Sequence, residues 1–406
     1  MIHRDAIADT GERAAARFAS HRIPAWLALA LPAGDGPAPV IEALGEDGPR
    51  TALVQCRTVF TLAHLSRLTA RPELLGAAHR IHGFVTAHLR DDDGGCRVAV
   101  AHDGAPLDDP QSRLRRSYDQ SFALLALAAL LRAGSDRVTE GDLEALWTFI
   151  GTHLTDARTG ALREDDRDAA GAAIRAQNPQ MHMLEALLEA HEATGQPVWL
   201  ERAGVLVGVA ERYFIDPASG SIREFVGPEL EPLGGAQGAR REPGHQFEWA
   251  WLLRRYAQAT GNPAPIAAAR RMQAFAEAHG IRRDGPLAGA PLDALDASGA
   301  PCEATHLLWP LTEAGKLYAM LSETDATAGA RTLAIADLIF GRYFAPGDAP
   351  HWVNQLDGEG RVIWDTALSR LLYHVALFVT EGGRAGLWRL DGQVLPETVS
   401  SQEETR

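Results

Sequence analysis

The chain has 406 residues, 46% of them hydrophobic, and its 53 acidic residues outnumber 39 basic ones to give a formal net charge of −14. Because a nucleic-acid-binding protein needs a basic face, this balance argues against a nucleic-acid partner. The sequence holds one lysine, Lys316, whose surroundings lack the glycine spacing and the Ser/Thr of a phosphate-binding loop. We therefore expect no lysine chemistry, and we expect Lys316 to lie at the surface or to extend along a helix towards water.

Cysteine usage and hydropathy indicate the compartment. The three cysteines, Cys56, Cys96 and Cys302, are widely spaced and form no C-x-x-C pair, which argues against a disulfide framework and a cysteine-rich zinc site. The N-terminus is charged and amphipathic, unlike a secretory signal, and no segment has enough uncharged apolar residues to span a membrane. The sequence therefore predicts a cytoplasmic protein with no membrane partner.

Apolar residues recur at intervals of three and four along most of the chain, and this spacing predicts helices. The predicted helices span residues 4–19, 51–69, 72–90, 116–133, 138–155, 176–194, 197–213, 243–260, 263–279, 303–322, 325–344 and 364–381. We expect the β-prone pieces Ala25–Leu31 and Arg97–Ala101 to form hairpins between helices, and residues 227–241 to form a loop. A single domain is expected over residues 1–390, followed by a polar tail over 391–406.

Conspicuous polar or aromatic side chains fall on every second predicted helix, at intervals of 61, 64, 63, 64 and 65 residues. They are Arg57, Tyr118, His182, His245, Trp309 and His374. A solenoid with this period would spread them along a groove, whereas a closed ring of six helical hairpins would bring them to one cavity. We favour the ring, an all-α barrel, because it explains the chemistry better.

The segment around His182 is the most informative in the chain. Asn178 followed by Pro179 is a suitable N-cap and first helical residue, which places His182 within the first turns of a helix. Glu185, three residues later, shares its face. The positive end of the helix dipole is expected to lower the pKa of a nearby histidine and to stabilise a developing oxyanion.

A second His-x-x-Glu pair, His245 and Glu248, follows Pro243 at another predicted helix start. Either pair alone could be structural, but two copies on alternate helices favour a functional role. A metal site is a competing interpretation, since histidine and carboxylate are common ligands. Di-iron bundles use the reverse order, Glu-x-x-His, and the one such pair here, Glu303 and His306, has no matching partner. We therefore favour a site without metal.

The other members of the series suggest sugar chemistry. His374 lies on an otherwise apolar face, where a neutral imidazole could accept a proton near pH 7, and two facing imidazoles could act on opposite sides of one carbon. Arg57 could bind an enediolate or hydroxyl oxygens. Tyr118 could bind hydroxyls or cap its helix, and Trp309, with Glu313 one turn on, offers a flat ring to a sugar or to the core.

Several segments together resemble the N-acylglucosamine 2-epimerase superfamily over nearly the whole chain. They are Arg57-Thr58-Val59-Phe60, Tyr118-Asp119-Gln120-Ser121-Phe122, Asn178-Pro179-Gln180-Met181-His182 through Glu185-Ala186, Pro243-Gly244-His245 through Glu248-Trp249-Ala250-Trp251-Leu252-Leu253, Trp309-Pro310 with Glu313, and Tyr373-His374. The resemblance implies an (α/α)6 barrel that isomerises or epimerises sugars without a cofactor or metal. It implies that His245 and His374 are the acid/base pair. The residues that it implies for substrate binding or ring opening are His182, Arg57, Asn178, Glu185, Glu248 and Trp309, to which we add Tyr118.

Within the superfamily the chain looks more similar to the aldose–ketose isomerase branch that includes mannose isomerases, although Leu311 and Leu371-Leu372 depart from the pattern of many isomerases. Our hypothesis is D-mannose–D-fructose isomerisation through a cis-enediol(ate), by a monomer or small homo-oligomer whose partner is a monosaccharide. The alternatives are a sugar 2-epimerase, a glycoside hydrolase or lyase that uses Glu185 and Glu248 as a carboxylate pair, and a non-catalytic sugar-binding protein.

Overall fold

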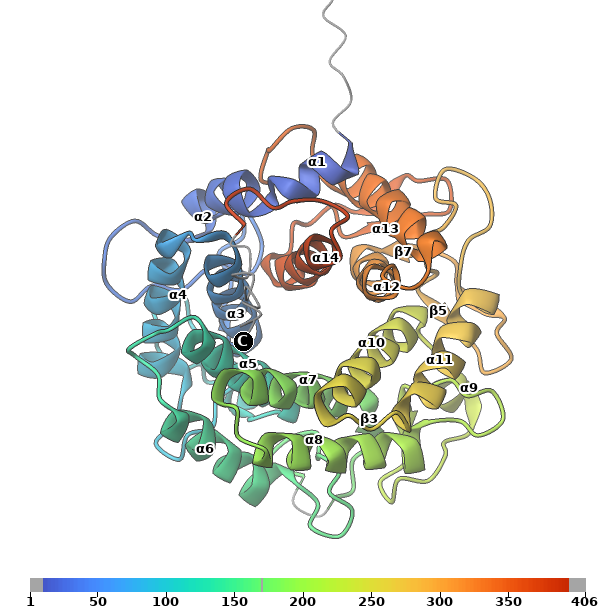
Figure 1. Ribbon diagram of the computed structural model, residues 1–406. Helices are drawn as coiled ribbons and strands as arrows, with labels where there is room; N and C mark the ends of the chain where they lie inside the picture. Colours follow the sequence, from blue (N-terminus) through green and yellow to red (C-terminus); the bar gives the residue numbers. More distant parts are fainter. Residues whose placement is uncertain (1–9, 169–170, 394–406) are drawn as a thin grey trace, which may run out of the picture.

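The computed structural model describes residues 10–168 and 171–393, in which the helices form two concentric rings (Figure 1). The inner ring consists of α3 (Ala52–Thr69), α5 (Ser117–Arg132), α7 (Gln177–Thr194), α10 (Pro243–Thr260), α12 (Leu308–Leu321) and α14 (Leu372–Arg384). The outer ring consists of α1 (Gly11–Ala16), α2 (Ile23–Ala30), α4 (Pro72–Phe84), α6 (Glu140–Phe149), α8 (Val198–Val209), α11 (Pro265–His279) and α13 (Ala326–Leu338). The predicted (α/α)6 barrel is confirmed.

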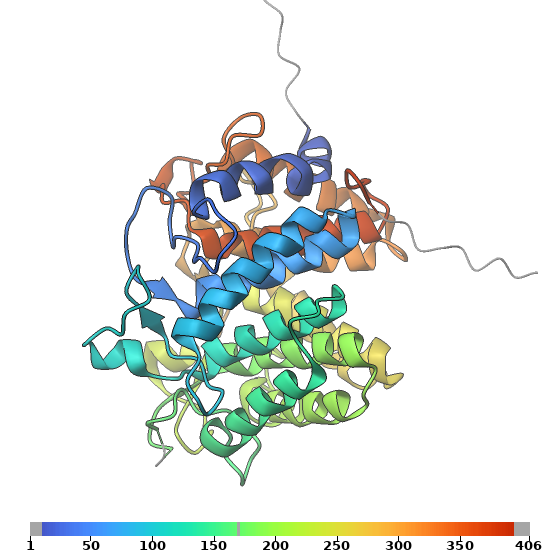
Figure 2. The ribbon, with the colours of Figure 1, turned by 90° about the vertical axis from the view of Figure 1, so that its left-hand side faces the viewer.

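Neighbouring inner and outer helices form the hairpins, as Figure 2 shows for α3 and α4, which lie side by side in blue. The first and last helices of the described residues close the ring. The last inner helix, α14, packs against α12 and α3, and the N-terminal helix α1 packs against α13 and α14. The sixth hairpin is therefore built from segments more than three hundred residues apart.

Short elements join the helices. Single π-helical turns follow or join outer helices: η1 (Phe18–Arg22), η2 (Val85–Leu89), η4 (Ile150–Leu154), η5 (Ala210–Phe214) and η6 (Ile339–Tyr343). The remaining helical pieces are η3 (Pro110–Arg113), α9 (Gly235–Ala239) and η7 (Ser369–Leu371). The strands form antiparallel ladders: β1 (Arg50–Thr51) with β2 (Ala99–Val100), β3 (Arg175–Ala176) with β4 (Phe225–Val226), β5 (Ala294–Leu295) with β6 (Pro301–Glu303), and β7 (His306–Leu307) with β8 (Gln355–Leu356) and β9 (Val362–Trp364).

A buried glutamine anchors four of the inner helices in the described chain to the loop before them. Gln55 accepts a hydrogen bond from the backbone N–H of Val40 and donates one to the same residue's carbonyl. The same paired bonds join Gln120 to Cys96, Gln180 to Leu162 and Gln246 to Ile222. A side-chain amide that satisfies both backbone groups of one residue removes the cost of burying them. The loops at this end of the barrel are thereby held in place.

Most of the predicted helices are found, but three of the sequence predictions were wrong in whole or in part. Ala25–Leu31 lies largely in helix α2, because Trp26 and Ala30 follow a helical spacing and are both about 1% exposed. The predicted helix 364–381 begins only at Leu372, since Val362–Trp364 pairs with β8 as a strand. The predicted loop 227–241 contains α9.

Some expectations concern residues that the structure does not describe. The first part of the predicted helix 4–19, up to residue 9, and the tail from residue 394 on lie outside the described residues. Among the helices of residues 10–168 and 171–393, none is long and apolar enough to cross a membrane.

Candidate active site

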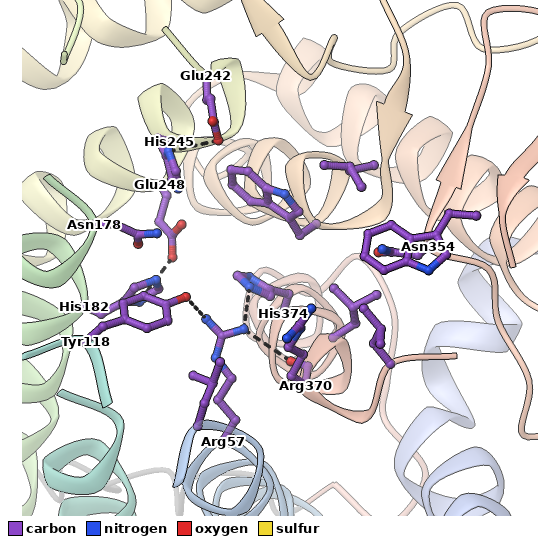
Figure 3. Close-up of a pocket in the computed structure, with 16 residues that line it drawn as sticks. Arg57, Tyr118, Asn178, His182, Glu242, His245, Glu248, Asn354, Arg370 and His374 are labelled. Carbon is purple, nitrogen blue, oxygen red and sulfur yellow. Dashed lines mark hydrogen bonds and ion pairs between the residues drawn. The ribbon is translucent and has the colours of Figure 1, made fainter. Parts of the chain in front are cut away.

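A cavity of about 340 Å³ opens at the end of the barrel where the inner helices begin (Figure 3). The residues that line it are Leu53, Arg57, Tyr118, Asn178, His182, Glu242, His245, Glu248, Leu307, Trp309, Asn354, Trp364, Leu368, Arg370, Leu371 and His374. Every member of the predicted six-residue series is among them. Because each inner helix starts here, the positive ends of the helix dipoles converge on the cavity.

His245 enters the cavity from the first turn of α10. Its imidazole ring is held by two carboxylates that precede this helix in the chain. Its Nδ1 lies 2.7 Å from Glu224 Oε2 and 3.4 Å from Glu242 Oε2. Burial favours the neutral ring, but the charges of Glu224 and Glu242 outweigh it and raise the pKa of His245 to about 9. The expectation that the helix dipole would lower this pKa was wrong, because the adjacent carboxylates dominate.

His374 enters from α14 in the opposite electrostatic setting. Its Nδ1 lies 2.8 Å from Glu313 Oε1, and an Arg57 Nη lies 3.4 Å from its Nε2. Since a guanidinium only donates, Nε2 must be the acceptor, which assigns the hydrogen to Nδ1. Burial, followed by the charge of Arg57 and that of Lys316, holds the pKa of His374 well below its usual value.

Trp309 lies between the two histidines. Its ring centroid is 4.7 Å from that of His245 and 5.9 Å from that of His374. Gly244 makes this approach possible, since a Cβ at that position would lie 2.4 Å from the Trp309 ring. The indole therefore offers a flat surface at the point where the two imidazoles converge.

The predicted His182–Glu185 pair forms within α7, with Nδ1 of His182 3.3 Å from Oε2 of Glu185. Burial lowers the pKa of His182 to about 3, despite the opposing effect of Glu185. The hydroxyl of Tyr373 donates a hydrogen bond to the same carboxylate oxygen. Glu185 is therefore covered by His182 and Tyr373 and does not line the cavity.

The second predicted pair, His245 with Glu248, does not form. His245 faces Glu224, whereas Glu248 faces His182 on α7. Oε1 of Glu248 lies 3.9 Å from Nδ1 of His182. Neither oxygen of Glu248 has a hydrogen-bond partner within the described chain. Burial, reinforced by the charge of Glu313, raises the pKa of Glu248 well above its ordinary value. The surroundings of Glu248 therefore favour its protonated form, and its carboxyl group faces the cavity.

Arg57, Tyr118 and Asn178 supply polar groups to the opposite wall. Arg57 Nη2 donates to the hydroxyl of Tyr118 at 2.8 Å, and its guanidinium lies 4.2 Å from the centroid of Phe122. Asn178 is the second residue of α7 rather than its N-cap, since the helix begins at Gln177. Its buried Oδ1 has no partner within the described residues, which leaves it available to a ligand hydroxyl.

Lys316 is not at the surface, so that expectation was wrong. It is 0% exposed, and its Nζ lies 2.5 Å from Glu313 Oε2, 4.0 Å from Glu248 Oε1 and 4.0 Å from the centroid of Trp251. The apolar pattern around the lysine suits an amphipathic surface helix, but it is equally typical of a helix in the middle of a barrel. The carboxylates that compensate its charge raise the pKa of Lys316 against the effect of burial.

The carboxylates and histidines beside the cavity have the composition of a metal site, but their surroundings do not suit a cation. Two sets of possible ligands, His182 with Glu185 and Glu248, and Glu248 with Glu313 and His374, share Glu248. The ammonium of Lys316 lies within 4.0 Å of that shared carboxyl group and would repel a metal ion. The third set includes His245, whose Nδ1 is occupied by its hydrogen bond to Glu224.

Several cavity residues were missed in the sequence. Glu242, Asn354, Trp364 and Arg370, and Glu224, which binds His245 without lining the cavity, come from loops, strand ends and η7, where neither helical spacing nor a motif marks them. Trp364 was hidden inside a helix prediction that started too early. The one available signal for Glu224 was the likeness of Gly220-Ser221-Ile222-Arg223-Glu224 to Gly160-Ala161-Leu162-Arg163-Glu164 in the preceding hairpin.

Comparison with known proteins places the chain among sugar-converting enzymes. It matches the N-acylglucosamine 2-epimerase (GlcNAc 2-epimerase) family over residues 43–377. It is 31% identical to a mannose-6-phosphate isomerase of Rhizobium meliloti over 71% of this chain and 74% of that protein. It is 30% identical to a D-mannose isomerase of Thermobifida fusca over 69% and 70% of the two chains. Among solved structures, a D-mannose isomerase superposes with a TM-score of 0.79 at 19% identity, over 90% of this chain and 97% of the other.

Proposed function

The chain belongs to the N-acylglucosamine 2-epimerase family and is an isomerase, and we propose that it interconverts D-mannose and D-fructose. One observation carries the proposal: two histidines face the same cavity with pKa values displaced in opposite directions. His245 holds a proton at neutral pH and His374 does not. Such a pair provides an acid and a base at the same time, as proton transfer between neighbouring carbons requires.

In this proposal His374 removes the proton from C2 of the open-chain aldose through its unprotonated Nε2, which the substrate would take over from Arg57. The electron pair of the C2–H bond forms the C1–C2 double bond, and the carbonyl oxygen O1 takes the proton of His245. Arg57 and the helix N-termini stabilise the negative charge of the cis-enediol(ate). Return of a proton from His374 to C1, with transfer of the O2 proton to the deprotonated His245, gives the ketose and restores both histidines.

The remaining cavity groups are proposed to bind the sugar and to open its ring. Asn178 Oδ1, the protonated Glu248 and the Tyr118 hydroxyl suit hydroxyl groups. The neutral His182, which also lines the cavity, is proposed to position these groups, and Glu185 holds its imidazole ring. Trp309 suits the apolar face of a sugar ring.

The dimensions and charges of the cavity support a neutral monosaccharide. Its volume of about 340 Å³ is near the lower end of the range of roughly 300–1,000 Å³ for ligand sites. Of the two arginines that line it, Arg370 is paired with Glu42 at 3.3 Å and Arg57 lies beside His374. Glu242 at the wall would repel a phosphate. We therefore favour D-mannose over its 6-phosphate.

The test is incubation of the protein with D-mannose in D₂O, followed by NMR. Deuterium at C1 of fructose is the expected result. Mannose 6-phosphate, run in parallel, is expected to react more slowly. If no hexose exchanges a proton, the proposal is wrong.

A 2-epimerase is the second candidate, because His245 and His374 approach Trp309 from different helices and could act on opposite faces of C2. Glucose labelled at C2 in the same experiment would support it. A glycoside hydrolase that pairs Glu185 with Glu248 is not supported, since Glu185 does not reach the cavity. Release of reducing ends from oligosaccharides would be required for that activity.

We also propose that residues 1–390 act as one catalytic domain in the cytoplasm. In its support, the largest cluster of buried apolar residues extends from Ala14 to Leu390. The thiols of Cys56 and Cys96 are buried and free, as is usual in a reducing compartment.

A further inference from the structure

The one lysine of the chain lies at the centre of the barrel, below the floor of the cavity. Lys316 is 0% exposed and does not line the cavity, so it does not touch a bound sugar. Its ammonium is 2.5 Å from Glu313 and 4.0 Å from Glu248. A buried ammonium is costly unless carboxylates compensate it, and replacement by an apolar side chain would be the simpler way to fill a core.

Glu313 connects this ammonium to the active site. One of its oxygens, Oε1, lies 2.8 Å from Nδ1 of His374, and the other, Oε2, lies 2.5 Å from Nζ of Lys316. The carboxylate is therefore shared between an imidazole and an ammonium. Glu313 is 0% exposed, so bulk water does not reach either of its carboxylate oxygens.

We propose that Lys316 is a positioning residue for the isomerisation: its ammonium keeps Glu313 ionised and oriented so that His374 presents an unprotonated Nε2 to the substrate. The inference rests on the proposed function only in taking His374 as the base. It adds to the site a residue that acts through Glu313 and never contacts the sugar.

Counting protons shows why the ammonium matters. Without it, the buried site takes up about one more proton, which binds either Glu313 or His374. If Glu313 is protonated, it donates to Nδ1 and the hydrogen of the neutral ring moves to Nε2. If His374 is protonated, both ring nitrogens carry hydrogen. In either case Nε2 no longer accepts a proton from C2.

Other charged groups also act on His374, and none replaces Lys316. The titratable and charged groups that face it are Arg57 on α3, Tyr118 on α5, His182 and Glu185 on α7, His245 and Glu248 on α10, Glu313 and Lys316 on α12, Arg370 on η7 and Tyr373 beside it. Apart from Lys316, the described cations in this group are Arg57, His245 and Arg370, and none of them lies within ion-pair distance of Glu313. Lys316 alone therefore compensates this carboxylate.

Arg255 provides a matched control, because it is a second buried cation against the same tryptophan. Its guanidinium carbon lies 4.7 Å from the centroid of Trp251, compared with 4.0 Å for Nζ of Lys316. It pairs with Glu192 and lies 4.0 Å from Glu189, away from His374. Arg255→Met thus removes a buried charge without touching the Glu313–His374 pair.

The experiment combines kinetics with ¹⁵N NMR of histidine in the full chain. Lys316→Met is expected to lower kcat by about 10²-fold or more with little change in KM, and to place hydrogen on Nε2 of His374. Lys316→Arg, which keeps the charge, is expected to recover most of the activity and the wild-type tautomer. Arg255→Met is expected to leave both unchanged.

The proposal is overturned if folded Lys316→Met keeps an unprotonated Nε2, or if Arg255→Met has the same effect. If Lys316→Met does not fold, wild-type protein labelled with ¹⁵Nζ-lysine still tests the proposal, because Lys316 is the one lysine of the chain and gives a single resonance. It must report a charged ammonium throughout the pH range of activity, and a neutral amine there overturns the proposal. Because the NMR readouts need no sugar, failure of wild-type turnover with hexoses would reject the proposed function without affecting them.

Discussion

The two ends of the barrel interior are both rich in charged side chains, but they differ in how these are partnered. At the end where the inner helices finish, Glu189 and Glu192 pair with Arg132, and Arg384 pairs with Glu381, around a void of about 10 Å³. We call this the packed end. At the other end, the described carboxyl oxygens of Glu248 and the amide oxygen of Asn178 have no partner beside a cavity of about 340 Å³.

The comparison teaches that buried charge alone does not mark a site. Arginine–carboxylate pairs at the packed end satisfy one another, so they hold the helices together and offer nothing to a ligand. His245 and His374 at the cavity end are each held at Nδ1 by a carboxylate and present the other nitrogen to the cavity, where that of His374 also lies 3.4 Å from Arg57. A binding site therefore requires space and donors or acceptors that the protein itself leaves unused.

The largest expected effect is the loss of the base at the cavity end. Replacing His374 by Asn is expected to lower kcat by about 10²–10⁴-fold, the usual contribution of general-base catalysis, with sugar binding retained. Initial rates and calorimetric titration with D-mannose measure the two effects. The matched control is His64→Asn, which removes a buried histidine whose Nε2 lies 3.1 Å from Thr380 Oγ1 at the packed end. Equal losses in both variants would contradict the contrast between the two ends.

The second prediction concerns the alkaline limit of activity. Because the pKa of His245 is about 9, its acid form is lost and kcat/KM falls as the pH rises through that value. Glu224→Gln removes the nearest carboxylate, so the pKa of His245 is lowered and the limit moves to lower pH by about one unit, or about fivefold in rate at pH 9. Glu189→Gln at the packed end is the control. If the alkaline limit of kcat/KM does not move in Glu224→Gln, His245 is not the acid.

The third prediction separates stability from activity. Arg132→Met leaves Glu189 and Glu192 without this arginine, which lies 3.0 and 2.5 Å from them. The free energy of unfolding is expected to fall by about 1–3 kcal/mol, while kcat stays within about twofold below the new melting temperature. Urea titration and initial rates measure the two quantities. A fall in kcat as large as that of His374→Asn would show that the two ends are not independent.

The smallest expected effect is that of removing divalent ions. Dialysis against a chelator is expected to leave kcat unchanged, because Lys316 already provides the positive charge beside Glu248 and Glu313. Loss of activity that only a divalent ion restores would favour a metal at the cavity end instead.

Much of the fold could be predicted because it depends on local spacing. The period of the inner helices and the series from Arg57 to His374 were visible in the sequence, and they placed one chemical group per hairpin at the same end of the barrel. The late start of α14 and the strand that contains Trp364 could not be predicted, since an apolar run suits both a strand and a helix until a neighbour such as β8 pairs with it.

For the site, the sequence by itself determined which side chains would share a helix face and which would lie near a helix start, because a period of 3.6 residues is a local property. Only the tertiary structure decided their protonation. Glu224 comes to His245 from a preceding loop, and Glu313 comes to His374 from another helix, so the pKa values of the two imidazoles depend on partners that their local sequences do not contain. The burial of Lys316 was decided in the same way, since charge and burial depend on segments that are distant in the chain and adjacent in space.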